Sequence, residues 1–275
     1  MRAAVAVVDS VTTLDAMHAG AVLVTGSHGG LIAARYAAAA GVRAAVFNDA
    51  GGGLDDAGVA GLQALERVGI AAAAVSHDSA RIGDAADTLA RGIVSRTNAP
   101  ALACGVRSGM HCEDAVEWLR DAATSAQPAP PLAAPEGRWI LRSAGPQGRA
   151  IVAVDSVGLV APEDAGCVLV IGSHGALHGG NPRSALGVDA HTAFFHDAGR
   201  GRDDAGTTRL PALASRGIAA GTVDYRSARI GDARSMWETG VLSCVNASLA
   251  AAGVRAGATV QDAVQWLDRR TRSNA

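Results

Sequence analysis

Residues 22–29 have the sequence VLVTGSHG, and residues 168–175 have nearly the same sequence, VLVIGSHG. Each stretch opens with a continuous apolar run, which is typical of a strand buried on both faces of a sheet. Each ends in a glycine-rich turn, and residues 31–40 then read as a helix that stops at Gly41. A buried strand that leads through such a turn into a helix predicts an α/β fold.

The match continues along the chain in the same order. VVDSV at residues 7–11 recurs as AVDSV at 153–157, SARIGD at 79–84 recurs at 227–232, and DAVEWL at 114–119 recurs as DAVQWL at 262–267. The offset is 146 residues in the first matches and 148 in the later ones, so the second copy carries an insertion near residues 178–182. A repeat of about 120 residues is too long for a solenoid unit and predicts a duplicated domain.

We therefore expect two homologous three-layer α/β/α units with mainly parallel sheets, packed about a pseudo-twofold axis like a homodimer. The first unit is predicted at residues 1–121 and the second at 149–275, with an extended Pro/Ala/Gly-rich linker at 122–148. In the first unit we expect strands at 4–8, 21–25, 42–47 and 70–75, and helices at 31–40, 55–68, 84–104 and 113–120. Within this pattern Asn98 falls inside a helix, and the apolar spacing around Trp118 and Trp266 predicts core positions.

Composition excludes several classes of function. The 275 residues have a net charge of -2, which argues against a nucleic-acid partner or an anionic membrane surface. All 24 basic residues are Arg, so Schiff-base chemistry and a phosphate-binding lysine of the Walker type are excluded. No apolar run is long enough to span a membrane. The four cysteines form no C-x-x-C pair, which predicts free thiols and a cytoplasmic location.

The repeated polar motifs follow the predicted strands, at the edge where open parallel sheets bind ligands. Ser27 and His28, with Ser173 and His174 in the second copy, are candidate catalytic residues because a histidine can act as acid, base or metal ligand. The neighbouring Gly29, Gly30 and Gly175 would expose main-chain N–H groups to an anion. The alternative is a plain strand-to-helix turn in which the serine caps the helix.

The next motif is Asp-Ala-Gly at residues 49–51 and 197–199. Asp49 and Asp197 are candidate bases or ligand-orienting carboxylates, and the preceding Asn48 and His196 are candidate ligand-binding residues. An Asp-Asp pair follows six residues later in each copy, for which helix capping is the alternative to a functional role. No cofactor is indicated with certainty and no metal ligand is assigned, although the carboxylates leave Mg²⁺ or another divalent metal open.

The longest identical block, Ser-Ala-Arg-Ile-Gly-Asp, carries an arginine suited to pair with a carboxylate or phosphate. Arg81 and Arg229, with Ser79 and Ser227, are therefore candidate ligand-binding residues. A salt bridge to Asp84 or to the other repeat is the alternative for the arginine. Asp84 and Asp232 are expected to cap helices.

Together these residues predict an enzyme that acts on a small anionic, carboxylate-type metabolite. Hydrolysis and proton transfer next to a carbonyl both fit serine, histidine and aspartate at one sheet edge. The alternatives are a non-catalytic module that binds a small anion and a purely structural pseudo-dimer. A homo-oligomer is compatible with the sequence, and no nucleic-acid or membrane partner is indicated.

Overall fold

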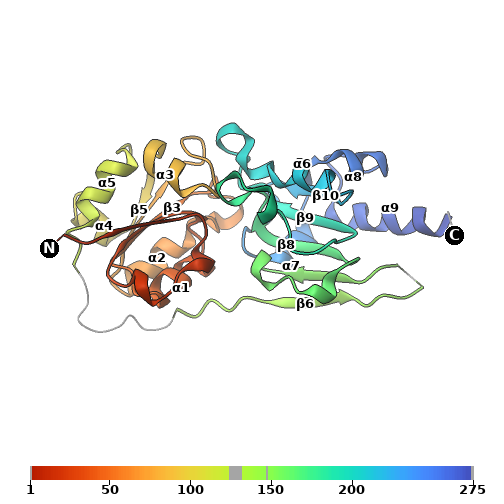
Figure 1. Cartoon of the computed structure of the whole chain (residues 1–275), viewed down its shortest axis with the longest axis horizontal. Coiled ribbons are helices and arrows are strands. Elements are labelled where there is room, and N and C mark those ends of the chain that lie inside the picture. The colour runs from red at the N-terminus through yellow and green to blue at the C-terminus, as the bar shows by residue number, and fades with distance from the viewer. Residues whose placement is uncertain (1, 124–131, 147, 274–275) are drawn as a thin grey trace. The chain divides into compact units, whose positions relative to one another are not determined.

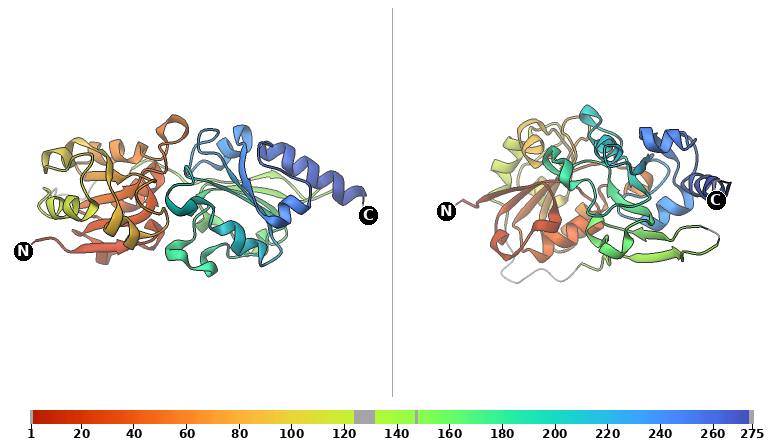
Figure 2. Two further views of the ribbon diagram at one scale, coloured as in Figure 1. Left: turned by 90° about the horizontal axis from the view of Figure 1, so that it is seen from above. Right: turned by 45° about the vertical axis from the view of Figure 1, so that its right-hand side comes forward.

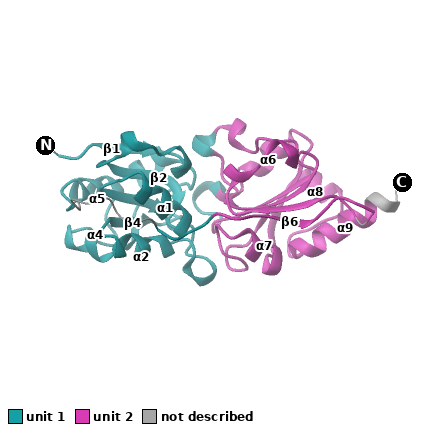
Figure 3. Cartoon of the chain, turned by 90° about the horizontal axis from the view of Figure 1, so that it is seen from below, with its two compact units in different colours: residues 1–135, 178–180, 200–205 teal, residues 136–177, 181–199, 206–275 magenta. Residues whose placement is uncertain are grey.

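The computed structural model of the protein describes residues 2–123, 132–146 and 148–273. The chain divides into two compact units, each with its own mainly parallel sheet (Figure 3). Unit 1 contains residues 1–135 and two short segments from later in the chain, 178–180 and 200–205. Unit 2 contains residues 136–177, 181–199 and 206–275.

The sheet of unit 1, which lies in the red to yellow part of the chain in Figure 1, has the strand order β1-β2-β3-β4-β5. The first four strands are parallel and β5 is antiparallel to β4. The strands are β1 (Val5–Val8), β2 (Val22–His28), β3 (Ala44–Asn48), β4 (Ala71–Val75) and β5 (Val94–Thr97). The helices are α1 (Leu31–Ala39), α2 (Ala60–Arg67), α3 (Ala85–Arg91), α4 (Ala99–Ala103) and α5 (Cys112–Leu119).

Helices cover both faces of this sheet because successive strand residues point to opposite sides. Val22 and Val24 of β2 pack in a cluster with α5, whereas Leu23 between them packs in a second cluster with α1 and α2. Alanine lines much of both clusters, so the helices approach the sheet closely. The four parallel strands confirm the prediction made from the apolar runs.

The sheet of unit 2 has the order β11-β10-β9-β8-β7-β6, and only its two outer strands are antiparallel to their neighbours. The strands are β6 (Arg138–Arg142), β7 (Ile151–Val154), β8 (Val168–His174), β9 (Thr192–His196), β10 (Ala219–Val223) and β11 (Leu242–Val245). The helices are α6 (Arg209–Ala214), α7 (Ala233–Thr239), α8 (Ala247–Ala251) and α9 (Val260–Ser273) (Figure 2).

A strand lies inside the range predicted as linker. β6 pairs antiparallel with β7, and Trp139 and Leu141 pack against the core of unit 2. Of the predicted linker 122–148, residues 124–131 and 147 lie outside the described residues.

The single helix predicted at 84–104 is wrong. The segment forms α3, then β5, then α4, with Gly92 as the C-terminal cap of α3. A side chain at Gly92 would clash with the carbonyl of Thr88 and with Val75, so only glycine allows this close packing at the end of α3. Val94 and Thr97 are β-branched and favour a strand, and Asn98 caps α4 instead of lying within a helix.

The helix predicted at 55–68 begins later than expected, at Ala60. Asp55 and Asp56 have φ angles of 56° and 53°, in the left-handed region, and therefore do not form the first turn of α2. The predicted caps Asp84 and Asp232 are confirmed, since each accepts a main-chain N–H from the first turn of its helix.

The prediction that Trp118 and Trp266 lie in the core is wrong. Their exposed fractions are 53% and 42%. A Cβ added at Gly105 would contact the Trp118 ring, and one at Gly253 would contact the Trp266 ring, so each indole lies across a glycine with its other side in solvent. Both residues belong to the apolar face of their helices, as the spacing predicts. They lie at the edge of that face, where one side of the ring contacts solvent.

Candidate functional site

The predicted site residues of unit 1 gather at the carboxyl end of its sheet. His28 and Asn48 are the last residues of β2 and β3 and lie opposite each other in register. Asp49 follows β3 directly, and His77 follows β4 by one residue. β3 and β4 are parallel neighbours, so the residues that follow them are held side by side.

At this edge Asp49 pairs with His77. Asp49 Oδ1 lies 2.9 Å from His77 Nδ1 and accepts the main-chain N–H groups of His77 and Gly51, also at 2.9 Å. Asp49 Oδ2 accepts the hydroxyl of Ser95 on β5 at 2.7 Å. The carboxylate is therefore fixed by three elements and holds the imidazole in one orientation.

The Asp49 carboxylate is ionised in this arrangement. Burial raises its pKa, but hydrogen bonds from the His77 ring, Ser95 and the main chain outweigh burial and hold the pKa below its ordinary value of 3.8. An ionised carboxylate only accepts hydrogen bonds, so Nδ1 of His77 carries a proton and the lone pair of the neutral ring lies on Nε2. The His77 side chain is 19% exposed, and Nε2 lies 3.6 Å from the exposed Asp78.

The loop after Asp49 is locked in an uncommon conformation. Residues 50–53 all have positive φ, between 50° and 72°, and the first of them is an alanine. Ala50 is fully buried and donates its N–H to the Asn48 side chain at 2.9 Å. Three glycines at 51–53 accommodate the left-handed turn at low cost, which explains the run of glycines after the Asp-Ala pair.

Asn48 and His196 bind the main chain. Asn48 accepts the N–H of Ala50 and donates to the carbonyl of Ala80 at 3.1 Å. His196 accepts the N–H of Ala198 at Nδ1, at 3.1 Å, and Nε2 lies 3.0 Å from the carbonyl of Ala228. Both side chains are fully buried, so the imidazole reproduces the bonds of the amide.

Ser27 and Ser173 hold the loops that follow β1 and β7. Ser27 Oγ accepts the N–H of Val11 at 3.1 Å, and Ser173 Oγ accepts the N–H of Val157 at 2.9 Å. Neither hydroxyl bonds an imidazole within the described residues. Their catalytic role stays a prediction.

The two neighbouring histidines each accept a main-chain N–H at Nδ1. His28 accepts that of Gly30 at 3.1 Å, and His174 accepts that of Ala176 at 3.3 Å. Gly29 and Gly175 donate their N–H groups to the carbonyls of residues 48 and 196, at 3.0 and 2.8 Å, and so join adjacent strand ends.

The first glycine of each Gly-Ser-His-Gly turn is required by packing. A Cβ at Gly26 would lie 2.5 Å from the main chain of Gly83 and Asp84, and Gly83 donates its N–H to the Gly26 carbonyl at 2.7 Å. Gly172 and Gly231 repeat this bond at 2.8 Å. The Gly-Ser-His-Gly turn and the Ser-Ala-Arg-Ile-Gly-Asp block of each half therefore pack directly on each other.

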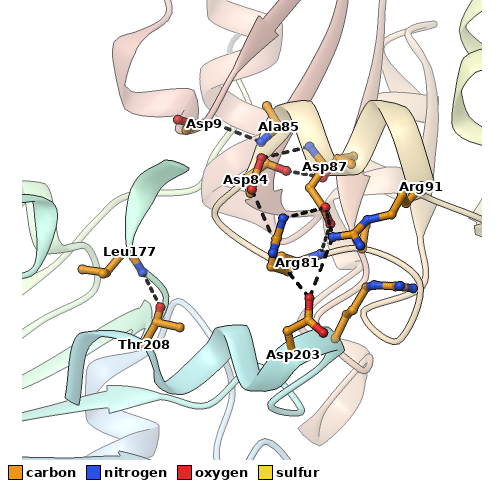
Figure 4. A network of polar contacts seen from close by, with 12 residues as sticks. Asp9, Arg81, Asp84, Ala85, Asp87, Arg91, Leu177, Asp203 and Thr208 are labelled. Carbon is orange, nitrogen blue, oxygen red and sulfur yellow. Dashed lines mark hydrogen bonds and ion pairs between the residues drawn. The ribbon is translucent and has the colours of Figure 1, made fainter. Parts of the chain in front are cut away.

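The guanidinium of Arg81 forms ion pairs with carboxylates of the protein itself (Figure 4). Arg81 binds Asp87 through both its main-chain N–H, at 2.7 Å, and its guanidinium, at 3.0 Å. Its guanidinium also lies 3.6 Å from Asp84 and 3.4 Å from Asp203, and Arg91 pairs with Asp87 and Asp203 as well. The guanidinium of Arg81 is therefore part of a salt-bridge network within unit 1.

Arg229 has a different environment in unit 2. A serine, Ser235, replaces the aspartate that binds the main chain of Arg81, and the Arg229 guanidinium lies 3.7 Å from Asp232. Its side chain is 49% exposed. Ser79 and Ser227 tie their own loops together, each donating to a carbonyl three residues earlier at 2.7 Å.

Unit 2 keeps the carboxylate but lacks the imidazole beside it. Asp197 accepts the main-chain N–H groups of Gly199 and Tyr225, at 2.9 and 3.0 Å, as Asp49 does in unit 1. Tyr225 stands where unit 1 has His77. Burial raises the pKa of Asp197, and the hydrogen bonds from Ser243 and the main chain do not overcome it.

Comparison of this chain with protein families, with curated proteins and with solved structures gives no match. The site must therefore be interpreted from its own chemistry.

The group at the centre of this geometry is His77. Tyr225 takes its place in the second half, and His77 was not among the predicted catalytic residues. Its place directly after β4, beside the strand that leads to Asp49, is the signal that could have identified it. Within residues 2–123, 132–146 and 148–273, no group of three or more His, Cys, Asp or Glu side chains is arranged to hold a metal ion. None of the described helices is both long enough and apolar enough to cross a membrane.

Proposed function

We propose that unit 1 is an enzyme unit that carries out acid–base chemistry on a small carboxylate-type metabolite, with His77 as the proton-transfer group. The single observation that supports this is the Asp49–His77 pair, whose carboxylate is also held by Ser95 and two main-chain N–H groups. A buried carboxylate that fixes the tautomer of a partly exposed histidine is the arrangement by which hydrolases and isomerases place a general base.

In this proposal Asp49 is a positioning residue and His77 transfers the proton. Nε2 takes a proton from a water molecule in hydrolysis, or from carbon next to a carbonyl in isomerisation, and returns it later in the cycle. The ionised Asp49 stabilises the imidazolium formed in between.

The test is a metabolite screen in heavy water. Full-length protein is incubated with a mixture of carboxylic acids and their esters, amides and lactones, and mass spectrometry follows hydrolysis products and deuterium incorporation next to carbonyls. We expect at least one compound to react, and His77→Asn to slow it by about 10²–10⁴-fold, the usual contribution of a general acid–base group.

The control is His111→Asn, which removes an exposed histidine at the start of α5 and should leave the rate unchanged. His28→Asn and His174→Asn, measured in the same assay, test the catalytic role predicted from the sequence. Turnover that survives both His77→Asn and Asp49→Asn would refute the proposal.

Unit 2 favours a second function, which is binding without catalysis. It retains the buried carboxylate of Asp197 but has Tyr225 in place of the histidine. Equilibrium dialysis of the compound found in the screen, with His77→Asn as the inactive background, tests for a second binding site.

We also propose that the two halves are copies of one ancestral unit that pack about a pseudo-twofold axis. Their shared strand order and their matched bonds from Ser27 and Ser173 support the duplication. An experimental structure of the full chain tests the packing.

A further inference from the structure

The segment at residues 200–205 belongs to unit 1, where it packs on the turn that carries His77. The Arg202 main-chain N–H donates to the His77 carbonyl at 2.8 Å. Gly201 has a φ of 63°, and a Cβ there would lie 2.8 Å from the same carbonyl, so only glycine allows this approach. Asp203 is held by Arg81 and Arg91, which fixes the other end of the segment.

The guanidinium of Arg202 is the cation that this packing brings to the His77 turn. Its Nη1 donates to the Ser79 carbonyl at 3.4 Å. In the described part of the chain its Nε is buried without a hydrogen-bond partner, and no carboxylate forms an ion pair with it. A buried N–H without a partner costs free energy, which favours a shift of this guanidinium toward an acceptor that a ligand would supply.

We propose that Arg202 binds the carboxylate group of the substrate beside His77. The inference rests on the proposed function, because it assigns the residue that recognises the anion at the same site. A guanidinium presents its N–H groups as a planar fork that matches the two oxygens of a carboxylate. Arg81, predicted for this role, is occupied by Asp87 and Asp203, whereas the half-buried Arg202 has donors to offer.

Arg202 is also specific to the second half of the sequence. The residue 148 positions earlier, at the same place in the first half, is Leu54. The first half therefore offers no matching arginine, and the proposed anion site lies beside the Asp49–His77 pair. The substrate class that fits is a small mono- or dicarboxylate whose reacting atom lies next to the carboxylate group.

The test measures binding without turnover, with sodium malonate as the probe and sodium chloride at equal ionic strength as the reference. NMR correlation spectra of the imidazole rings of the full-length protein follow the His77 signal, which His77→Asn assigns. We expect malonate to shift this signal saturably. Arg202→Gln should raise the Kd by about ten- to hundred-fold, because charge-assisted hydrogen bonds are lost.

Arg202→Lys keeps the charge but loses the fork, so its Kd should lie between those of the wild type and Arg202→Gln. Arg67→Gln is the matched control, since it removes an exposed arginine of α2 whose guanidinium donates to Gln63, and its Kd should equal that of the wild type. Thermal melts confirm that each variant is folded.

The outcome separates this inference from the proposed function. A wild type that does not respond to malonate, or an Arg202→Gln variant with unchanged Kd, would overturn the anion site. Malonate binding that depends on Arg202, together with metabolite turnover that survives His77→Asn, would overturn the acid–base function and leave the anion site standing.

Discussion

The two halves differ most clearly at one residue beside a shared carboxylate. Asp49 and Asp197 accept matching main-chain N–H groups and each has a serine partner, yet their pKa values are displaced in opposite directions. The histidine beside Asp49 supplies the stabilisation that Asp197 lacks. The two sheet edges share the same main-chain bonds to the aspartate and differ in the side chain beside it, which is His77 in unit 1 and Tyr225 in unit 2.

Tyr225→His should create a second Asp–His pair in unit 2. The main-chain N–H of residue 225 already binds Asp197 at 3.0 Å, so the introduced imidazole starts from the same anchor as His77. We expect the pKa of Asp197 to fall from above 3.8 to below it, as measured by NMR titration of its carboxyl carbon. Tyr225→Phe is the control, and a carboxyl pKa that stays raised in Tyr225→His would contradict the prediction.

His196 makes the stability of unit 2 sensitive to mild acid. Burial lowers the pKa of His196 from 6.5 to about 4 in the folded protein. Between these pH values His196 is protonated in the unfolded chain but neutral in the folded chain. The free energy of unfolding therefore falls as the pH falls. The loss through this window amounts to about 3 kcal/mol, at 1.36 kcal/mol per pKa unit.

His196→Asn should remove this loss, because Asn48 makes the equivalent pair of main-chain bonds in unit 1. Urea unfolding of both proteins at pH 6.5 and at pH values down to about 4 measures the difference. Parallel pH profiles for the variant and the wild type would show that another group is responsible.

At the scale of the elements, one buried asparagine joins a helix, a strand and the next helix in each unit. Asn98 donates to the carbonyls of Leu62 and Ile70 and accepts the N–H groups of Ala72 and Ala101. Asn246 makes the same four bonds in unit 2 at 2.9–3.3 Å, to Leu210, Ile218, Ala220 and Leu249.

Asn98→Ala and Asn246→Ala should therefore each destabilise the protein by about 3 kcal/mol or more, since two buried N–H groups and two carbonyls lose their partner. Chemical denaturation of each variant measures the change. Gln63→Ala on the exposed face of α2 is the control, because it removes a side-chain amide that faces solvent, and it should have little effect. A loss below about 1 kcal/mol in both asparagine variants would contradict the prediction.

The sequence predicted the central strands well and the edges poorly. Continuous apolar runs such as Ala71–Val75 identify β1 to β4, of which β2 to β4 are buried and β1, at the edge of the sheet, is only partly buried. β5 has the sequence Val-Ser-Arg-Thr, which is too short and polar to stand out beside two helical segments. The candidate residues lie at the carboxyl edge of the sheet as expected, but the partner of Asp49 depends on which loops meet there, and sequence spacing does not give that.

At the scale of the whole molecule, the apolar core is divided. Unit 1 has two buried clusters, one on each face of its sheet, and unit 2 has two of its own. Separate cores predict that a defect in one unit opens that unit first.

Hydrogen exchange followed by mass spectrometry tests this expectation. Asn246→Ala should speed exchange in β8 to β10 and leave β2 to β4 protected as in the wild type, and Asn98→Ala should do the reverse. Equal acceleration throughout the chain in either variant would show that the two units unfold as one.

The tryptophans, which report on unfolding through their fluorescence, are unevenly distributed between the two units, and Trp118 is exposed. It is the only tryptophan of the sequence within unit 1, whereas Trp139, Trp237 and Trp266 all belong to unit 2. Because the Trp118 indole already faces water, melting of unit 1 should change the emission colour little. Intrinsic fluorescence will therefore report mainly on the C-terminal half, and a melting curve recorded by it alone will overlook the half that carries His77.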